Sequence, residues 1–210
     1  MEKVACLYVF DTMADWEYAI LVSELHSGGY FRPGRPPIRV ITAARTSDPV
    51  TTMGGIRILP DLTVADCRTA ELAALILPGG ETWASAEHDP VLALAALCLR
   101  EGIPVGAICG AVLGLARTGQ LNDRLHTAND LGWLRASAPE YRGETHYRHA
   151  PAVADGPLVT ATGAAPLEFA MEMLRILDVF TREILDAWYR FYKTQAPEAY
   201  YTLAASLSQV

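Results

Sequence analysis

The chain has 210 residues, of which 51% are hydrophobic, and it carries a formal net charge of -7. This length suits one large domain or one domain with an appendage. The acidic balance argues against nucleic-acid binding, because neutralising phosphates requires clustered lysine and arginine. The apolar runs are too short for a signal peptide or a membrane span, so we expect a cytoplasmic protein without nucleic-acid or membrane partners.

The N-terminal half alternates short apolar runs with helical stretches, which is the pattern of a parallel sheet covered on both faces. A first strand is followed by a helix that Asp15 would cap and that Gly28 would close. A second strand, a hairpin and a third strand come next. The predicted strands and hairpin are Val4 to Phe10, Ile38 to Thr42, Val50 to Leu59 (the hairpin) and Leu72 to Leu77.

The C-terminal half continues the alternation and so predicts an α/β fold with a mostly parallel sheet. The predicted elements are a helix at Pro90 to Arg100, a strand at Ile103 to Ile108, helices at Gly110 to Thr118 and Leu131 to Ser137, a hairpin at Ala152 to Thr162 and a helix at Pro166 to Leu177. A last helical stripe, Thr181 to Thr194, indicates core packing or a subunit interface, with a cofactor or peptide groove as the alternative.

The four cysteines, Cys6, Cys67, Cys98 and Cys109, have no CxxC spacing. Neither a zinc site nor a disulfide framework is therefore indicated, and we expect no metal and no cofactor. A buried structural thiol is the usual role of an isolated cysteine, and we assign it to Cys6 and Cys98.

Cys109 differs because it stands between a predicted strand and a predicted helix, among the small residues of Gly106 to Ala111. Such a junction exposes a side chain at the carboxyl edge of the sheet, where open α/β sheets bind ligands, and it has the logic of a nucleophile elbow. The amino end of the following helix favours a thiolate, so we expect a lowered pKa for Cys109. A buried structural cysteine is the alternative.

Two further segments follow strands in the same way. Pro78-Gly79-Gly80 comes directly after the strand ending at Leu77, and its N–H groups, with that of Gly110, would suit an oxyanion hole. Glu17 follows the first strand closely enough to hydrogen-bond a cysteine at a neighbouring elbow. A simple loop and a solvated glutamate are the alternative interpretations of these two features.

Together with Thr160 to Gly163 and Pro166 to Ala170, these motifs resemble the ThiJ/PfpI superfamily, which shares the class I glutamine amidotransferase-like fold. The resemblance implies a flavodoxin-like three-layer sandwich with a cysteine nucleophile elbow over residues 1–180. Residues 181–210 would form a helical extension packed on this domain or on a dimer partner. It also implies a homodimer, Cys109 as nucleophile, Glu17 as a protonated carboxyl beside the sulfur, and Gly80 and Gly110 as oxyanion donors.

The chain departs from the superfamily pattern at two places. PfpI-type peptidases have histidine directly after the nucleophile, where this chain has Gly110, so peptidase activity is not expected. Other members have a histidine shortly after the elbow helix; His126 is the candidate here, with its register shifted by two residues. His146 and His149 are further candidates, whereas His26 and His88 read as surface or helix-end residues.

The resemblance predicts a cysteine-dependent hydrolase or amidohydrolase-like enzyme of deglycase, glyoxalase or hydratase type, acting on a small-molecule electrophile. Cys109, Glu17 and His126 would be its catalytic residues. The alternative is a non-catalytic oxidation-sensing or stress-response protein that uses the same cysteine. A regulatory ligand-binding domain is a third possibility.

Overall fold

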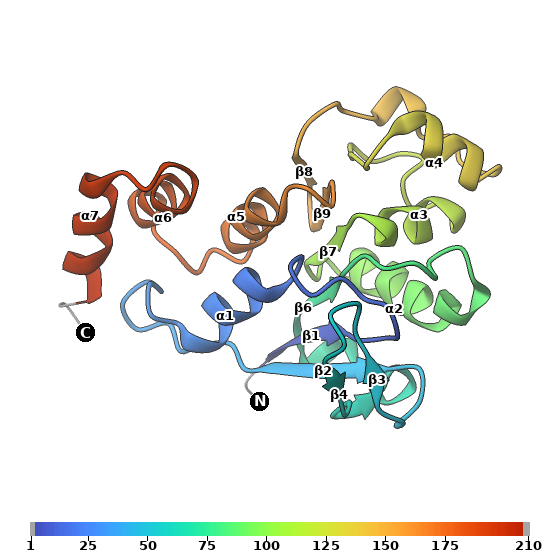
Figure 1. The fold of residues 1–210 in the computed structure, drawn as a ribbon, viewed down its shortest axis with the longest axis horizontal. Coiled ribbons are helices and arrows are strands. Elements are labelled where there is room, and N and C mark those ends of the chain that lie inside the picture. Colours follow the sequence, from blue (N-terminus) through green and yellow to red (C-terminus); the bar gives the residue numbers. More distant parts are fainter. Residues whose placement is uncertain (1–2, 208–210) are drawn as a thin grey trace.

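The computed structural model describes residues 3–207 and contains a seven-stranded sheet with the order β5-β2-β1-β6-β7-β9-β8 (Figure 1). Its strands pair in parallel except for β8, which lies antiparallel to β9 at one edge. The strands are β1 (Val4–Tyr8), β2 (Val40–Ala44), β5 (Leu62–Thr63), β6 (Leu72–Leu77), β7 (Val105–Ile108), β8 (Ala152–Asp155) and β9 (Leu158–Ala161). A separate hairpin, β3 (Val50–Thr51) and β4 (Arg57–Ile58), confirms the predicted one.

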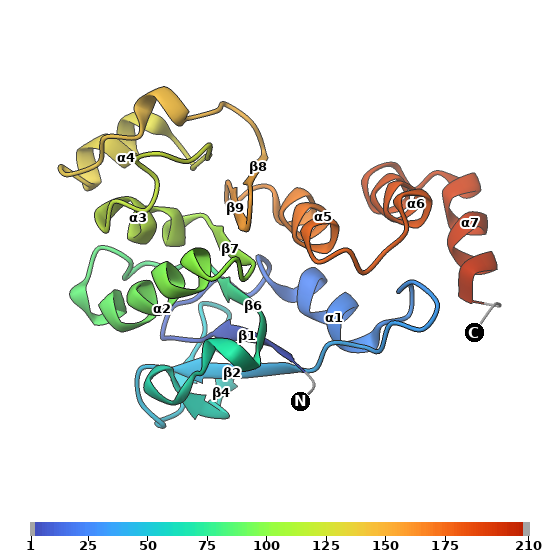
Figure 2. The ribbon, with the colours of Figure 1, turned by 180° about the vertical axis from the view of Figure 1, so that it is seen from behind.

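Helices cover both faces of the sheet, which confirms the predicted three-layer α/β sandwich. Figures 1 and 2 show α1 and α5 on one side and α2 and α3 on the other, with α4 beyond α3 and the pair α6 and α7 beyond α5. The helices are α1 (Ala19–Ser27), α2 (Asp89–Arg100), α3 (Gly110–Arg117), α4 (Leu131–Ser137), α5 (Pro166–Ile176), α6 (Arg182–Thr194) and α7 (Pro197–Leu207). No helix within residues 3–207 is long and apolar enough to cross a membrane.

The burial of the four central strands explains why their sequences are almost entirely apolar. Every residue of β1, β7 and β9 is buried, as is all of β6 except Ala73. Strands buried on both faces lose the alternation of polar and apolar residues and become nearly continuous apolar runs. Because β1, β6, β7 and β9 are parallel neighbours in the sheet, their carboxyl ends lie side by side at one edge.

The beginning of α1 differs from the prediction. The helix begins at Ala19, because residues 15–18 form turns instead of a first helical turn. Asp15 does not cap it: the carboxylate accepts a hydrogen bond from the N–H of Gly54, 2.7 Å away, in the β3–β4 hairpin. Tertiary contact with this hairpin thus competes successfully with local capping and leaves residues 15–18 free to line the sheet edge.

The C-terminal helices pack on the same chain. Trp188 of α6 is completely buried, and its indole N–H donates to Glu24 of α1 at 2.8 Å. Helix α6 also packs on α5, and α7 packs on α6. The helical stripe predicted over Thr181 to Thr194 is therefore an apolar face directed at its own domain.

Candidate active site

Four segments meet at the carboxyl edge of the sheet because their strands are neighbours. The order β1-β6-β7-β9 brings together the segments that follow these strands, which carry Glu17, Gly79 and Gly80, Cys109, and Gly163 respectively. Residues separated by more than 140 positions in the chain thus surround one sulfur atom. This is the edge at which parallel sheets bind ligands.

Cys109 has a strained backbone conformation. Its φ of 58° and ψ of -120° lie in a region that residues other than glycine rarely adopt. The conformation allows the chain to turn directly from β7 into α3, while the N–H of Cys109 still donates to the carbonyl of Ala161 in β9 at 2.9 Å. The predicted strand-to-helix elbow is present, and it directs the half-buried side chain out of the sheet.

Gly110 is required by packing at this elbow. A Cβ atom there would lie 2.7 Å from the carbonyl oxygen of Gly80 and 2.8 Å from the indole ring of Trp83. Atoms this close must shift apart, and a backbone carbonyl moves only with its loop. The histidine that follows the nucleophile in PfpI-type peptidases has no room at this position.

Glu17 lies beside the sulfur. Its side chain is only 1% exposed, and its Oε2 accepts a hydrogen bond from the N–H of Gly79. Apart from the Cys109 thiol, its Oε1 has no hydrogen-bond partner among residues 3–207. A Cβ on Gly163 would lie 3.0 Å from this oxygen and 2.8 Å from Cys109 Sγ, so both atoms border the same glycine.

Asn129 contacts the sulfur from the other side and was not identified from the sequence. Its Nδ2 donates to Cys109 Sγ at 3.2 Å, while its Oδ1 accepts from the N–H of Gly163 at 2.8 Å. The second bond fixes the amide so that the donor end faces the sulfur. Its position was the one available sequence signal, because Asn129 lies three residues after His126, in the segment that follows the elbow helix.

Burial governs the proton equilibrium of this pair. It raises the pKa of Glu17 to about 7, against the lowering effects of the Gly79 N–H and of Cys109. Burial, followed by the charge of Glu17 and the hydrogen bond with it, also raises the pKa of Cys109, while Asn129 and the Gly110 N–H lower it. The lowered thiol pKa expected from the helix terminus is therefore wrong, because burial and a neighbouring carboxylate outweigh the amide donors. Each of the two groups therefore shifts the pKa of the other.

His126 is not brought to Cys109. Its Nδ1–H donates to the carbonyl of Arg124 at 2.7 Å, and its Nε2 accepts from the hydroxyl of Tyr141 at 2.6 Å. The ring is completely buried, and burial lowers its pKa. With both nitrogens engaged elsewhere, this histidine holds the loop before Asn129 in place instead of exchanging protons with the sulfur.

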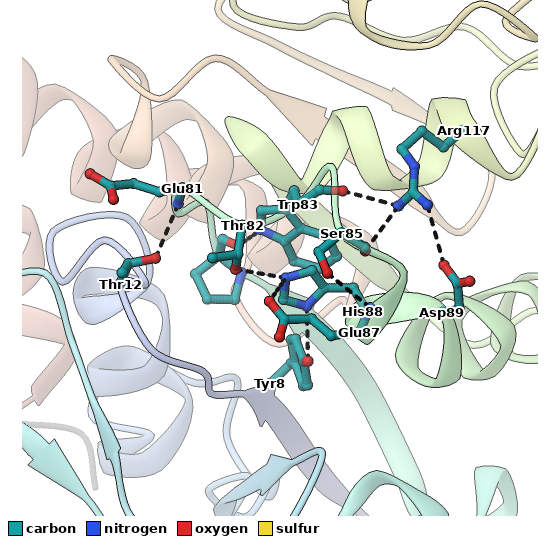
Figure 3. A network of polar contacts seen from close by, with 11 residues as sticks. Tyr8, Thr12, Glu81, Thr82, Trp83, Ser85, Glu87, His88, Asp89 and Arg117 are labelled. Carbon is teal, nitrogen blue, oxygen red and sulfur yellow. Dashed lines mark hydrogen bonds and ion pairs between the residues drawn. The ribbon is translucent and has the colours of Figure 1, made fainter.

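The loop that carries Gly80 is supported from behind by a buried cluster of rings (Figure 3). The indole of Trp83 is 1% exposed and donates to the carbonyl of Pro78 at 2.9 Å. The N–H of Glu81 donates to the hydroxyl of Thr12 at 3.2 Å, and Arg117 donates to the carbonyl of Trp83 at 3.1 Å. These contacts hold the loop against the elbow, and the amide nitrogen of Gly80 lies 3.4 Å from the Cβ position at Gly110.

His88 lies inside this cluster, which corrects the surface position expected for it. It precedes α2, so the helix-end expectation holds, but it is completely buried. Its ring nitrogens lie 2.9 Å from the hydroxyl of Tyr8 and 2.8 Å from that of Thr82, and the ring stacks on Trp83 with centroids 4.4 Å apart. Burial lowers its pKa, which favours a neutral ring with one donor and one acceptor nitrogen.

The sulfur faces an open hollow of about 530 Å³ lined by Trp16, Glu17, Cys109, Asn129, Thr162, Gly163 and Ala164. Trp16 is 52% exposed, and its indole donates to the carbonyl of Gly163 at 3.2 Å. A second hollow of about 330 Å³ shares Asn129, Thr162 and Ala164 with the first and adds His149 and Lys193. No group of three or more histidine, cysteine, aspartate or glutamate side chains in residues 3–207 is arranged to hold a metal ion.

Known proteins share this architecture. The sequence model of the DJ-1/PfpI family matches residues 3–176. The chain is 46% identical over 203 residues to the "Uncharacterized protease YoaZ" of Bacillus subtilis, covering 97% of each chain. The crystal structure of a thiJ/pfpI family protein from Bacillus anthracis has a TM-score of 0.93 and 47% identity, over 97% of this chain and 96% of that one.

The DJ-1 superfamily protein Atu0886 from Agrobacterium tumefaciens has a TM-score of 0.81 and 34% identity, over 92% of this chain and 98% of its own. These matches confirm the resemblance and the fold that were predicted from the elbow and glycine motifs. The chain belongs to the DJ-1/PfpI family.

Proposed function

We propose that this protein is a cysteine-dependent hydrolase or amidohydrolase-like enzyme that adds the Cys109 thiol to a small carbonyl electrophile. The observation that carries the proposal is the junction of one strained cysteine, one buried carboxyl group and one amide donor beneath an open hollow. Strained backbone conformations concentrate at functional sites, and a buried proton-accepting group beside a nucleophile is the usual means of activating it.

The proposed step balances without a cofactor. The thiol proton passes to Glu17, Sγ bonds to the carbonyl carbon, and the π electron pair moves to the oxygen. The N–H groups of Gly80 and Gly110 stabilise this oxyanion, which then takes the proton from Glu17. The net change is addition of S–H across C=O, which deglycase, glyoxalase and amide-hydrolysing reactions have in common. With an amide, loss of the amine leaves a thioester that water hydrolyses.

Two observations support these roles. The pKa of about 7 for Glu17 lies where a carboxyl group both accepts and releases a proton near neutral pH. The Gly110 N–H already acts on the sulfur, and the Gly80 amide nitrogen lies 3.4 Å from the Cβ position at Gly110. His126 is left out of the proposal because its ring nitrogens are bonded to Arg124 and Tyr141.

Peptide hydrolysis is not proposed, although the relative YoaZ is named a protease. Gly110 replaces the histidine of PfpI-type peptidases, and the carbonyl of Gly80 occupies the place where a side chain would begin. A small substrate could lie in the open hollow with one face against the exposed indole of Trp16.

Oxidation sensing remains the second candidate function. It is favoured by the donors that surround the sulfur, because Asn129 Nδ2 and the Gly110 N–H would equally bind the oxygens of an oxidised cysteine. No histidine among residues 3–207 makes a hydrogen bond to Cys109 Sγ to assist turnover. In the enzyme, Cys109 Sγ would bond to a substrate carbon, whereas in the sensor it would bond to oxygen.

The test compares the wild-type protein with Cys109→Ser. The matched control is Cys98→Ser, because Cys98 is a buried cysteine of α2 outside the proposed site. With methylglyoxal or a small amide as substrate, we expect turnover by the wild type and the control. We expect a loss on the order of 10³-fold or more in Cys109→Ser, because the covalent route disappears. Absence of turnover together with selective peroxide oxidation of Cys109 would favour the sensor instead.

The family resemblance also leads us to propose a homodimer. Light scattering of the purified protein at several concentrations tests this directly, and a constant monomer mass would rule it out. We also propose a cytoplasmic location, as expected from the lengths of the apolar runs in the sequence.

A further inference from the structure

A second sulfur site lies away from the elbow. Cys6 and Cys67 are 61 positions apart in the chain, yet their Sγ atoms lie 4.0 Å apart. Cys6 is completely buried in the middle of β1, whereas Cys67 is half-buried and follows a short turn, Val64–Asp66. The fold therefore places a protected thiol against one that borders the surface.

The different burial of the two sulfurs decides which of them ionises. Burial and the neighbouring thiol raise the pKa of Cys6. Either sulfur can donate in the contact between them, and Cys67 Sγ also lies 3.7 Å from the carbonyl oxygen of Thr63. The hydrogen bond from Cys6 lowers the pKa of Cys67, against the opposing effects of burial and Asp66. The negative charge thus falls on the sulfur that solvent reaches more easily, which is the arrangement of an attacking thiolate beside a resolving thiol.

We propose that Cys6 and Cys67 form a redox-active dithiol that a peroxide converts into an intramolecular disulfide. The Cys67 thiolate attacks one peroxide oxygen, an S–O bond forms, the O–O bond breaks, and hydroxide leaves with the electron pair. Cys6 then attacks the Cys67 sulfur and expels the sulfenic oxygen, which leaves as water with the Cys6 proton. The thiols lose two electrons, and hydrogen peroxide is reduced to two molecules of water.

The local structure accommodates this bond. A disulfide has an S–S distance of about 2.05 Å, so the sulfurs must approach by about 2 Å. Cys6 is fixed between β2 and β6, opposite Ile41 and Leu75. Cys67 belongs to no helix or strand and lies between two single-turn segments, Val64–Asp66 and Thr69–Glu71, so no strand pairing opposes its movement toward Cys6.

The dithiol is chemically separate from the proposed catalytic site. The groups that act on Cys109 are Glu17, Asn129 and Gly110, and none of them acts on Cys6 or Cys67. Cys98 is the nearest competitor, because it interacts electrostatically with both members of the pair. A decisive experiment must therefore distinguish a Cys6–Cys67 bond from a Cys67–Cys98 bond.

The sequence allows this distinction in the wild-type protein. Trypsin cleaves after lysine and arginine but not before proline, so each cysteine falls in its own peptide: residues 4–39, 58–68, 69–100 and 101–117. The native protein is treated with hydrogen peroxide, the remaining thiols are blocked with N-ethylmaleimide under denaturing conditions, and the peptides are identified by mass. We expect peptides 4–39 and 58–68 to disappear in equal amounts and one cross-linked product to replace them. Dithiothreitol should cleave this product and restore the two free peptides.

Variants sharpen the result. Cys109→Ser should form the same cross-link, whereas Cys67→Ser should keep Cys6 fully alkylatable after peroxide treatment. The proposal is overturned if Cys67 advances to sulfinic acid while Cys6 stays free, if peptide 58–68 is joined to 69–100, or if the cross-link joins two chains on a non-reducing gel. Because the wild-type map needs no substitution, a misfolded variant does not weaken the test.

Discussion

The Cys109 site and the Cys6–Cys67 site are built from similar groups, but the pKa values of their half-buried thiols shift in opposite directions. Cys109 and Cys67 are both half-buried, and each lies beside a buried ionisable side chain. This neighbour is Glu17 for Cys109 and Cys6 for Cys67. The pKa of Cys109 is raised, whereas that of Cys67 is lowered. Burial is the largest cause of the raised pKa of Cys109, and the charge of Glu17, a carboxyl group of pKa about 7, adds to it. At Cys67 the hydrogen bond from the buried Cys6 thiol is the largest effect, and it outweighs burial and lowers the pKa.

The backbones differ as well. Cys109 is held at a positive φ by the strand-to-helix turn, with amide donors on two sides, whereas Cys6 lies in a regular strand. A strained turn fixes a sulfur toward a hollow in which a substrate has room, while a strand and a short turn bring two sulfurs together. The comparison teaches that the partner group and the local backbone, rather than the cysteine itself, select addition chemistry at one site and thiol oxidation at the other.

The largest expected effect follows from the buried carboxyl group. Folded Glu17 keeps its proton up to about pH 7, but the unfolded chain releases it near pH 4.3. Stability from this residue is therefore fully present below pH 4 and is lost as pH rises through 7. In Glu17→Gln, we expect the same free energy of unfolding as wild type at pH 4 and about 3 kcal/mol more at pH 8.

Urea denaturation across this pH range measures the difference. Glu140→Gln is the control, because its side chain is 86% exposed and the substitution should change stability by less than about 0.5 kcal/mol at either pH. If Glu17→Gln and the wild type keep a constant difference from pH 4 to pH 8, the pKa of Glu17 is the same in the folded and unfolded protein. The proposed contrast between Glu17 beside Cys109 and Cys6 beside Cys67 would then be wrong.

A smaller effect is expected from crowding the elbow. Gly110→Ala places a methyl group 2.7 Å from the carbonyl oxygen of Gly80, so we expect a loss of about 2 kcal/mol of unfolding free energy. Gly29→Ala is a matched control, because its new methyl group would have no neighbour nearer than 3.7 Å and should cost less than about 1 kcal/mol. Equal midpoints for the two variants in urea would show that the elbow tolerates a side chain and is not tightly packed.

The smallest effect concerns the thiols themselves. Alkylation by iodoacetamide, followed against pH for each cysteine peptide, should reach its midpoint at lower pH for Cys67 than for Cys109. Cys6→Ala removes the donor to Cys67, and Asn129→Ala removes the donor to Cys109. Each variant should slow its own cysteine by up to about tenfold at pH 7 and leave the other unchanged, since one pKa unit corresponds to a tenfold change in thiolate.

A lower midpoint for Cys109 than for Cys67 in the wild type would reverse the comparison. It would also restore the expectation, drawn from the amino end of α3, that amide donors dominate at the elbow. A response of both cysteines to either variant would indicate a global change in the fold, which circular dichroism detects.

Local sequence patterns sufficed for most of the fold. The prediction for Leu72 to Leu77 coincides with β6, and that for Leu131 to Ser137 coincides with α4, while the strand predicted from Val4 ends two residues early, at Tyr8. Continuous apolar runs and helical periodicity depend only on neighbours in the chain, which explains this agreement. Strand β5, of two residues, gave too little pattern to be recognised, whereas α7 falls within the helical extension predicted over residues 181–210.

The sequence by itself determined the α/β class, the elbow at Cys109 and the placement of Glu17 and the glycines at one sheet edge, because these follow from strand ends and glycine positions. Only the tertiary structure decided that Asn129 contacts the sulfur, that His126 and His88 are buried in other networks, and that Cys6 meets Cys67. It also decided the direction of the thiol pKa values. Burial and contacts between distant residues set these properties, and neither leaves a periodic signal in the chain.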